Sequence, residues 1–369
     1  MKAFNEDPES IFYGRINTDN IFISGHSRGG GASLISYLQM QNSISGIIDF
    51  EGVDITRYGY GSPDISVPFL GFTASEDTDL DYPYCEPTEG QLKAPYTWVT
   101  INGGIHAWTA STLPLRNEDN PSIEQWQQHD IQEFYATAFL LEHSQIPDLG
   151  SYNVVSILFD LEGASMITEN ISEQGVFIRW NSWNTQDIVI DDFNGIYSEE
   201  PDTEVNLLGG VNISSDLQRS EEVSSYRPDD DNPISQYLKT ISRLLVSEDG
   251  KTGVFTMWFS DERDDSSEDE EDDFTEIPVP DGFSFQASVK GMDDQTIPET
   301  ARVVFHSSLG DISLDIYQFI GPLALENRFQ QLVIPSSLLP SNIRGVSIEL
   351  RGSMFIENPR FTNYYHQEN

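Results

Sequence analysis

A pentapeptide near the start of the chain, Gly25-His26-Ser27-Arg28-Gly29, has the residue types that a serine nucleophile needs. It follows an apolar run at 20–24 and precedes a stretch with helical periodicity at 29–41. In a G-x-S-x-G motif the serine occupies a sharp strand-to-helix turn, where small neighbours let the strained backbone pass. The pattern predicts Ser27 as a nucleophile; the alternative is a plain glycine-rich turn that begins a helix.

A serine hydroxyl is a weak nucleophile, so it needs a base and a carboxylate that orients the base. After this motif the expected chain order is an acid and then a histidine. An acidic segment directly follows a predicted strand at 67–73, where the carboxyl end of that strand would place it. Asp77 is the first choice for the orienting acid, Asp79 the second and Glu76 the third. The alternative for each is a solvated loop carboxylate.

His106 is the histidine, among six, whose context suits a general base. It follows a predicted strand at 96–101 and a pair of glycines, so a loop can carry it back to the serine. His26 lies inside the motif and is interpreted as packing beside the turn. The backbone N–H of Arg28, directly after the nucleophile, is predicted to donate a hydrogen bond to the oxyanion.

These residues need a parallel sheet to bring them together. Apolar runs that alternate with helical patterns predict four strands and two helices in the first part of the chain. The strands are expected at 20–24, 44–50, 67–73 and 96–101, and the helices at 29–41 and 122–143. Strands that alternate with helices are typical of a parallel sheet with covered faces, so we expect an α/β domain over 1–148.

The pattern changes at 147–150, which is expected to be a linker, and extension strands are expected within 149–182. Strand-like runs then dominate, and with turn residues between them they predict an all-β sandwich or jelly roll over 183–369. Residues 235–245 are expected to form a small helix or a buried crossover, and the acidic run 261–273 an exposed loop. The strands are predicted at 154–159, 176–180, 252–259, 283–289, 301–306, 312–317, 330–334, 346–350 and 355–361.

The composition excludes several classes of partner. The chain has 61 acidic and 19 basic residues and a net charge of −42, so nucleic acid and anionic membranes are both excluded because they would be repelled. No apolar run approaches the roughly 20 residues that a membrane span needs. Scarce lysine and abundant acid are typical of halophilic proteins; the alternative is an ordinary acidic secreted protein. We expect an extracellular or cell-surface location, although the chain shows no signal peptide.

The first domain resembles the C-terminal half of bacterial α/β-hydrolases of the dienelactone-hydrolase and cutinase-like type. The resemblance implies a serine esterase or lipase that acts without a cofactor. Arg28 departs from the Met or Gln common in cutinase-like members and leaves the subfamily open. The matching residues are Gly25-His26-Ser27-Arg28-Gly29-Gly30, the segment 67–77 and Gly103-Gly104-Ile105-His106.

In this fold the nucleophile usually follows the fifth strand, whereas only about twenty residues precede it here. The earlier N-terminal strands, and the loop that gives the second oxyanion donor, are therefore expected to be absent from the chain. Either the chain is a fragment or another chain supplies the rest. Losing one oxyanion donor costs on the order of a hundredfold in rate, so the activity of these residues alone is open.

The second domain resembles the galactose-binding-like jelly rolls of carbohydrate-binding modules. Domains of this kind bind glycans, hold structural calcium or pack on a catalytic domain. The matching stretches are 190–193, 283–289, 301–316, 332–335 and 354–361.

Two functions follow from these patterns. The first is hydrolysis of a carboxylic ester through an acyl-enzyme on Ser27, with an acylated glycan, a lipid or a polyester as substrate. The same residues would also serve a peptidase or a thioesterase. The alternative is a catalytically incomplete hydrolase that acts as a glycan-binding or surface interaction protein.

Overall fold

The computed structural model describes most of the chain and divides it into two compact units. One unit comprises Met1–Val176 and Trp180–Ser182, and the other comprises Phe177–Arg179 and Trp183–Asn369. In the described residues, no helix combines the length and the apolar character that a membrane crossing requires. The described residues are 2–40, 43–53, 55, 59–60, 64–80, 91–110, 120–144, 154–159, 161–182, 186–191, 193, 205–223, 242–259, 276–291, 298–320 and 330–362.

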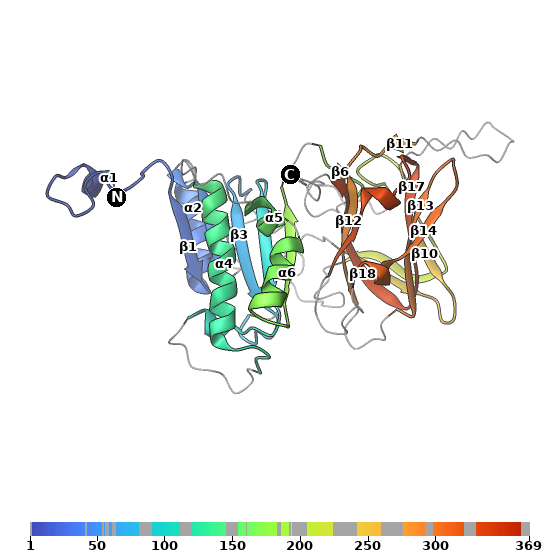
Figure 1. The fold of residues 1–369 in the computed structure, drawn as a ribbon, viewed down its shortest axis with the longest axis horizontal. Coiled ribbons are helices and arrows are strands. Elements are labelled where there is room, and N and C mark those ends of the chain that lie inside the picture. The colour runs from blue at the N-terminus through green and yellow to red at the C-terminus, as the bar shows by residue number, and fades with distance from the viewer. Residues whose placement is uncertain are drawn as a thin grey trace. The chain divides into compact units, whose positions relative to one another are not determined.

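The first unit is built on a five-stranded sheet with the order β1-β2-β3-β4-β5 (Figure 1). Strands β1 to β4 are parallel to one another, which confirms the predicted parallel arrangement. The strands are β1 (Phe22–His26), β2 (Gly46–Phe50), β3 (Phe69–Ala74), β4 (Tyr96–Ile101) and β5 (Val176–Asn181). Strand β1 continues past its predicted end at residue 24, because Gly25 and His26 still pair with Asp49 and Phe50 of β2.

Five helices accompany this sheet in the described residues. Helix α2 packs on β1 and β2, and α4 lies over one face of the sheet (Figure 1). Phe139 of α4 stands edge-on to Phe22 of β1, with ring centroids 6.0 Å apart. A capping box of Glu124 and Gln127 fixes the start of α4. The helices are α1 (Lys2–Glu6), α2 (Arg28–Met40), α4 (Gln125–His143), α5 (Val154–Phe159) and α6 (Leu161–Asn170).

The strand predicted at 154–159 is wrong, because these residues form helix α5. A six-residue apolar run fits a buried helix as well as a strand, and periodicity cannot separate the two. Contacts with α4 on one side and α6 on the other hold the segment in the helical form. The expected linker at 147–150 lies outside the described residues.

The second unit is a sandwich of two antiparallel sheets, with the orders β14-β13-β17-β10-β7 and β15-β12-β18-β9-β8. A small pair, β11 (Ile277–Pro278) and β16 (Asn342–Ile343), lies outside them, and β6 (Ile188–Val189) pairs with β18. The first sheet contains β7 (Asn212–Ser215), β10 (Gly253–Trp258), β13 (Thr300–His306), β14 (Ile312–Asp315) and β17 (Gly345–Arg351). The second contains β8 (Leu217–Val223), β9 (Ser242–Ser247), β12 (Ser284–Gly291), β15 (Gln330–Ile334) and β18 (Ser353–Thr362).

One apolar core fills the space between the two sheets, because alternate residues of each strand point inward. Phe285 of β12 stands edge-on to Phe305 of β13 at 5.3 Å and to Phe361 of β18 at 5.6 Å. This packing confirms the predicted all-β organisation. Residues 242–245, expected within a helix or crossover, begin strand β9. The expected acidic loop at 261–273 lies outside the described residues.

Replacing Phe285 with alanine should remove the centre of this core. Phe285 is fully buried, so we expect Phe285→Ala to lower the free energy of unfolding by about 3–5 kcal/mol, as large-to-small changes in cores do. Leu309, which is 87% exposed, offers a matched control: Leu309→Ala should change the free energy of unfolding by less than about 0.5 kcal/mol. Urea unfolding of the two variants measures both values, and equal losses would contradict the assignment of the core.

Candidate active site

Four neighbouring parallel strands each bring one polar side chain to the same edge of the sheet. Ser27 directly follows β1 and Glu51 directly follows β2, while Asp77 and His106 lie in the loops after β3 and β4. The carboxyl ends of parallel strands meet at one edge, so these four residues gather although 79 positions separate the first from the last. The three residues predicted to form the triad, Ser27, Asp77 and His106, are therefore on one edge of one sheet.

The turn at Ser27 has the strained geometry of a strand-to-helix elbow. Ser27 has a φ of +58°, which a residue with a side chain rarely adopts and which costs of order 1–3 kcal/mol. Its N–H donates to Phe50 O at 3.0 Å, and its own carbonyl accepts from Gly30 N at 3.0 Å. A Cβ on Gly25 would lie 2.1 Å from Gly29 O, so only glycine fits there. The surrounding backbone thus holds the serine in its strained conformation.

Arg28 is the first residue of α2 and its side chain is exposed. The N–H groups in the first turn of a helix have no acceptor within the helix, and the helix dipole places partial positive charge there. The Arg28 N–H therefore lies at the N-terminal end of α2, directly beside Ser27, and its role as an oxyanion donor stays a prediction.

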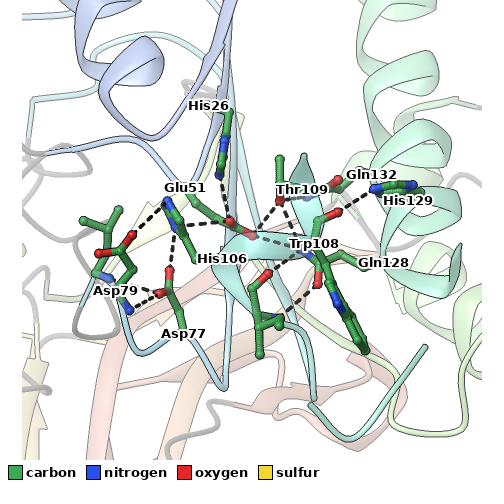
Figure 2. Close-up of polar contacts among 12 residues, drawn as sticks. His26, Glu51, Asp77, Asp79, His106, Trp108, Thr109, Gln128, His129 and Gln132 are labelled. Atoms are coloured by element: carbon green, nitrogen blue, oxygen red, sulfur yellow. Dashed lines mark hydrogen bonds and ion pairs between the residues drawn. The ribbon is translucent and has the colours of Figure 1, made fainter. Parts of the chain in front are cut away.

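His106 and Asp77 form a buried hydrogen-bonded pair (Figure 2). His106 Nδ1 lies 3.0 Å from Asp77 Oδ2, and the two side chains are 6% and 4% exposed. The other oxygen, Asp77 Oδ1, accepts hydrogen bonds from the backbone N–H groups of Asp79 at 2.7 Å and Leu80 at 3.0 Å. Asp77 is thus fixed by its own loop, and it fixes the imidazole ring in turn.

The other two candidate acids occupy different places. Asp79 Oδ2 lies 3.8 Å from His106 Nε2, on the side of the ring opposite Asp77, and the Asp79 side chain is 36% exposed. Glu76 holds the loop through its backbone N–H, which donates to Gly104 O at 2.9 Å. Of the three acids weighed in the sequence, Asp77 is the one at hydrogen-bond distance from Nδ1 of His106.

A second buried carboxyl group, Glu51, also approaches His106. Its Oε1 accepts from Thr109 Oγ1 at 3.0 Å and from Gln128 Nε2 at 3.2 Å. Its Oε2 lies 3.4 Å from His106 Nδ1 and 3.5 Å from His26 Nε2 (Figure 2). The Glu51 side chain is 1% exposed. His26 therefore packs beside the turn, as interpreted from the sequence, and its ring also lies 4.5 Å from that of His106.

Burial dominates the ionisation of the groups under the turn. It raises the pKa of Glu51 well above the ordinary value for a glutamate, against the opposing charge of His106. It also raises the pKa of Asp49, in β2, to about 7, although a hydrogen bond from the Gly52 backbone acts in the opposite direction. Burial lowers the pKa of His26, while a hydrogen bond to the His106 backbone raises it.

Asp49 and Glu51 are the residues of the site that sequence reasoning missed. Asp49 lies against the helix turn, because a Cβ on Gly30 would be 2.1 Å from its Oδ1 and one on Gly52 would be 2.0 Å from it. The signal was present in the sequence: an acid at 49 interrupts the mostly apolar run 47–50, and a second acid follows it at 51. A buried acid in such a run must have a partner or carry a proton.

The hydroxyl of Ser27 is not hydrogen-bonded to His106 in the part of the chain that the structure describes. His106 Nε2 instead faces Asp79. The edge of the sheet therefore contains a histidine oriented by Asp77 and a serine in a strained conformation, with no hydrogen bond between the two side chains among the described residues.

Comparisons with known proteins identify no family for the chain. No family model matches it, and no curated protein matches it. Among solved structures it is similar to a family 11 carbohydrate-binding module from Clostridium thermocellum in complex with a mixed-linked tetrasaccharide. The identity is 10% and the TM-score 0.25, over 49% of this chain and 98% of that one.

Two further structures are similar at the same low level. The CBM27-1 module of Caldicellulosiruptor saccharolyticus with mannohexaose has 10% identity and a TM-score of 0.28, over 50% of this chain and 100% of that one. An exo-1,3/1,4-β-glucanase from a Pseudoalteromonas species has 12% identity and a TM-score of 0.24, over 34% of this chain. The chain spans 14% of the length of that glucanase. Likenesses of this size establish neither family nor activity.

The raised pKa of Asp49 predicts a specific pH dependence of stability. Between about pH 4 and pH 7 the folded protein keeps a proton on Asp49 that the unfolded chain has released, so the free energy of unfolding falls as the pH rises through this range. Asp49→Asn mimics the protonated form, so its free energy of unfolding should not fall in this way. The difference in free energy of unfolding between Asp49→Asn and the natural protein should therefore increase by roughly 4 kcal/mol over this range and stay constant at higher pH.

Denaturant unfolding at pH 4, 5.5, 7 and 8 measures this difference, and Asp19→Asn serves as the control because Asp19 is exposed. A difference between Asp49→Asn and the natural protein that stays constant with pH would show that Asp49 is already ionised throughout this range.

Proposed function

We propose that the first unit is a serine hydrolase that cleaves carboxylic esters. The observation that carries the proposal is the conjunction of Ser27 at a φ of +58° on a strand-to-helix turn with a buried His106–Asp77 pair at 3.0 Å on the same sheet edge. The strained turn presents the nucleophile, and the pair supplies an oriented base. Strand, elbow, acid and histidine in this order are the arrangement of α/β-hydrolases, so the sheet is proposed to be part of that fold.

The proposed reaction uses these three side chains. Asp77 accepts a hydrogen bond from the Nδ1–H of His106, which holds the ring in the tautomer whose Nε2 lone pair takes the proton of Ser27 Oγ as this oxygen attacks the ester carbonyl. The imidazolium then gives that proton to the departing alcohol, and an acyl group remains on Ser27. Water, deprotonated by the same Nε2, attacks the acyl carbon, and the proton returns to Ser27 as the acid leaves.

Negative charge on the carbonyl oxygen must be stabilised during both steps. The N–H of Arg28 and the N-terminal end of α2 are proposed for this role, because both lie directly beside Ser27. The site needs no metal or organic cofactor for this chemistry. An acylated glycan, a lipid and a polyester all present the same ester group, and each suits the extracellular or cell-surface location expected for an acidic chain.

Removing the nucleophile should abolish ester hydrolysis and leave the fold unchanged. We expect Ser27→Ala to lower kcat for p-nitrophenyl acetate or butyrate by about four to six orders of magnitude. Ser36→Ala is the matched control, because Ser36 lies on the same helix and its hydroxyl bonds only to the Ala32 carbonyl. Steady-state assays of purified protein measure both rates; hydrolysis that survives Ser27→Ala would rule out this nucleophile.

A second candidate function, glycan contact, is favoured by one observation in the second unit. Trp258 of β10 pairs with Gly345 of β17, which in turn pairs with His306 of β13, so the three form a row across the outer face of the sheet. A Cβ on Gly345 would lie 2.6 Å from the Trp258 ring, so the ring packs closely against the β17 backbone at this glycine. Its centroid is 4.8 Å from that of His306. Flat aromatic rings beside polar groups are suited to stacking on sugar rings.

The polar groups beside this tryptophan are held in fixed positions. His306 Nδ1 lies 2.9 Å from Asp311 Oδ2, and His306 Nε2 lies 2.6 Å from Ser347 Oγ. Although these are the residue types of a triad, Ser347 is 2% exposed and lies in a central strand whose backbone is paired on both sides. It has neither access for a substrate nor a free N–H for an oxyanion. The network is proposed to orient His306 beside Trp258.

Removing the Trp258 ring should weaken glycan binding and leave esterase activity unchanged. Affinity electrophoresis in gels that contain β-glucan, xylan or mannan compares Trp258→Ala with Trp126→Ala, a tryptophan of the other unit that is 55% exposed. We expect Trp258→Ala to reduce retention about tenfold or more, because burying an aromatic side chain contributes roughly 1.5–3 kcal/mol. Equal retention of both variants, or none by the natural protein, would contradict the glycan-binding proposal.

A further inference from the structure

Three residues of the first unit, His26, Glu51 and His106, each bring one atom able to bind a metal ion to within 4.8 Å of the others. Glu51 Oε2 lies 3.5 Å from His26 Nε2 and 3.4 Å from His106 Nδ1, the atom that is also hydrogen-bonded to Asp77. Glu51 Oε2 and His26 Nε2 are both buried and both lack a hydrogen-bond partner. Such orphaned groups are rare in folded proteins, and each needs an explanation.

The pair of His26 Nε2 and Glu51 Oε2 makes this arrangement unusual. The two atoms lie 3.5 Å apart (Figure 2), and neither has a hydrogen-bond partner among the described residues. An unprotonated imidazole nitrogen and a carboxylate oxygen are both acceptors. In these forms the two groups repel each other, and a cation between them relieves the repulsion.

The spacing suits a metal ion rather than a direct hydrogen bond. A tetrahedral zinc ion has Zn–N and Zn–O bonds of about 2.0–2.2 Å, which puts neighbouring ligand atoms about 3.3–3.5 Å apart. Glu51 Oε2 lies 3.5 Å from His26 Nε2 and 3.4 Å from His106 Nδ1. Two imidazoles and a carboxylate are ligand types that zinc prefers. The second oxygen of Glu51 is held by Thr109 and Gln128, as the carboxylates of metal sites usually are.

We propose that His26 Nε2, Glu51 Oε2 and His106 Nδ1 form a binding site for a divalent transition-metal ion such as Zn²⁺. An ion would enter beside the His26 side chain, which is 21% exposed, although its Nε2 atom is buried. Binding requires the lone pair of His106 Nδ1, so it breaks the hydrogen bond to Asp77 and moves the ring proton to Nε2. The site is therefore inhibitory: it turns the base of the proposed hydrolase into a ligand.

Binding is measured directly on the full-length chain after treatment with a chelator. Co²⁺ reports tetrahedral coordination by its visible absorption, and isothermal titration with Zn²⁺ gives the stoichiometry and Kd. We expect one ion per chain. Glu51→Gln and His26→Gln should each weaken binding at least about 100-fold, beyond the effect of losing an outer partner. His143→Gln is the matched control, since this histidine packs against Phe139 on α4, away from the cluster.

The outcomes distinguish the metal site from the proposed hydrolase. Metal binding does not depend on the proposed function; only the inhibitory effect of the metal rests on it. Ser27→Ala should bind Zn²⁺ as tightly as the natural protein while losing hydrolysis. Zinc binding by a natural protein that shows no hydrolysis would support the metal site and remove the hydrolase. Unchanged affinity in both Glu51→Gln and His26→Gln, with circular dichroism showing that they fold, would overturn the metal site. Hydrolysis that persists at saturating Zn²⁺ would overturn the role of His106 as a ligand.

Discussion

The first unit depends on burying carboxyl groups around one imidazole at the edge of a parallel sheet. Asp77 and Glu51 both approach Nδ1 of His106, at 3.0 Å and 3.4 Å, and neither side chain is more than 4% exposed. Two ionised carboxylates this close in a dry site repel each other, so burial favours a proton or another cation on one of them. Burial raises the pKa of Glu51 well above the ordinary value for a glutamate, which favours a proton on this group, while Asp77 accepts hydrogen bonds from two backbone N–H groups.

The same constraint explains the elbow. Ser27 is held at positive φ by strand β2, because the Phe50 carbonyl of that strand accepts a hydrogen bond from the Ser27 N–H. Asp49 of the same strand lies against the first turn of α2. Ser27, Asp77 and His106 thus follow three different strands of the sheet. Buried polar contacts join His106 to Asp77 and to Glu51, and backbone hydrogen bonds join Ser27 to β2.

Short-range patterns in the sequence were sufficient to predict most strands and to select Ser27, Asp77 and His106, which the structure places at one edge of the sheet; their catalytic roles stay predictions. Glu51 and Asp49 were missed because a carboxylate inside an apolar run gives no indication of its partners until the sheet is assembled. The segment 154–159 was assigned to a strand because its apolar character is the same in either form, and its packing on α4 decides for a helix. Strands β7 and β8 show little alternation of apolar and polar residues, and they pair with β10 and β9, which lie further along the chain. No local pattern therefore predicted them.

The central claim is that Ser27 is an activated nucleophile, and covalent labelling tests it most directly. The protein is treated with a fluorophosphonate, digested and searched by mass spectrometry for the phosphonylated peptide, with heat-unfolded protein as the control. The account predicts one adduct, located on Ser27 in the peptide that contains Gly25 to Gly31, and none in the unfolded chain. A folded protein that carries no adduct, or an adduct on another serine, would contradict the account.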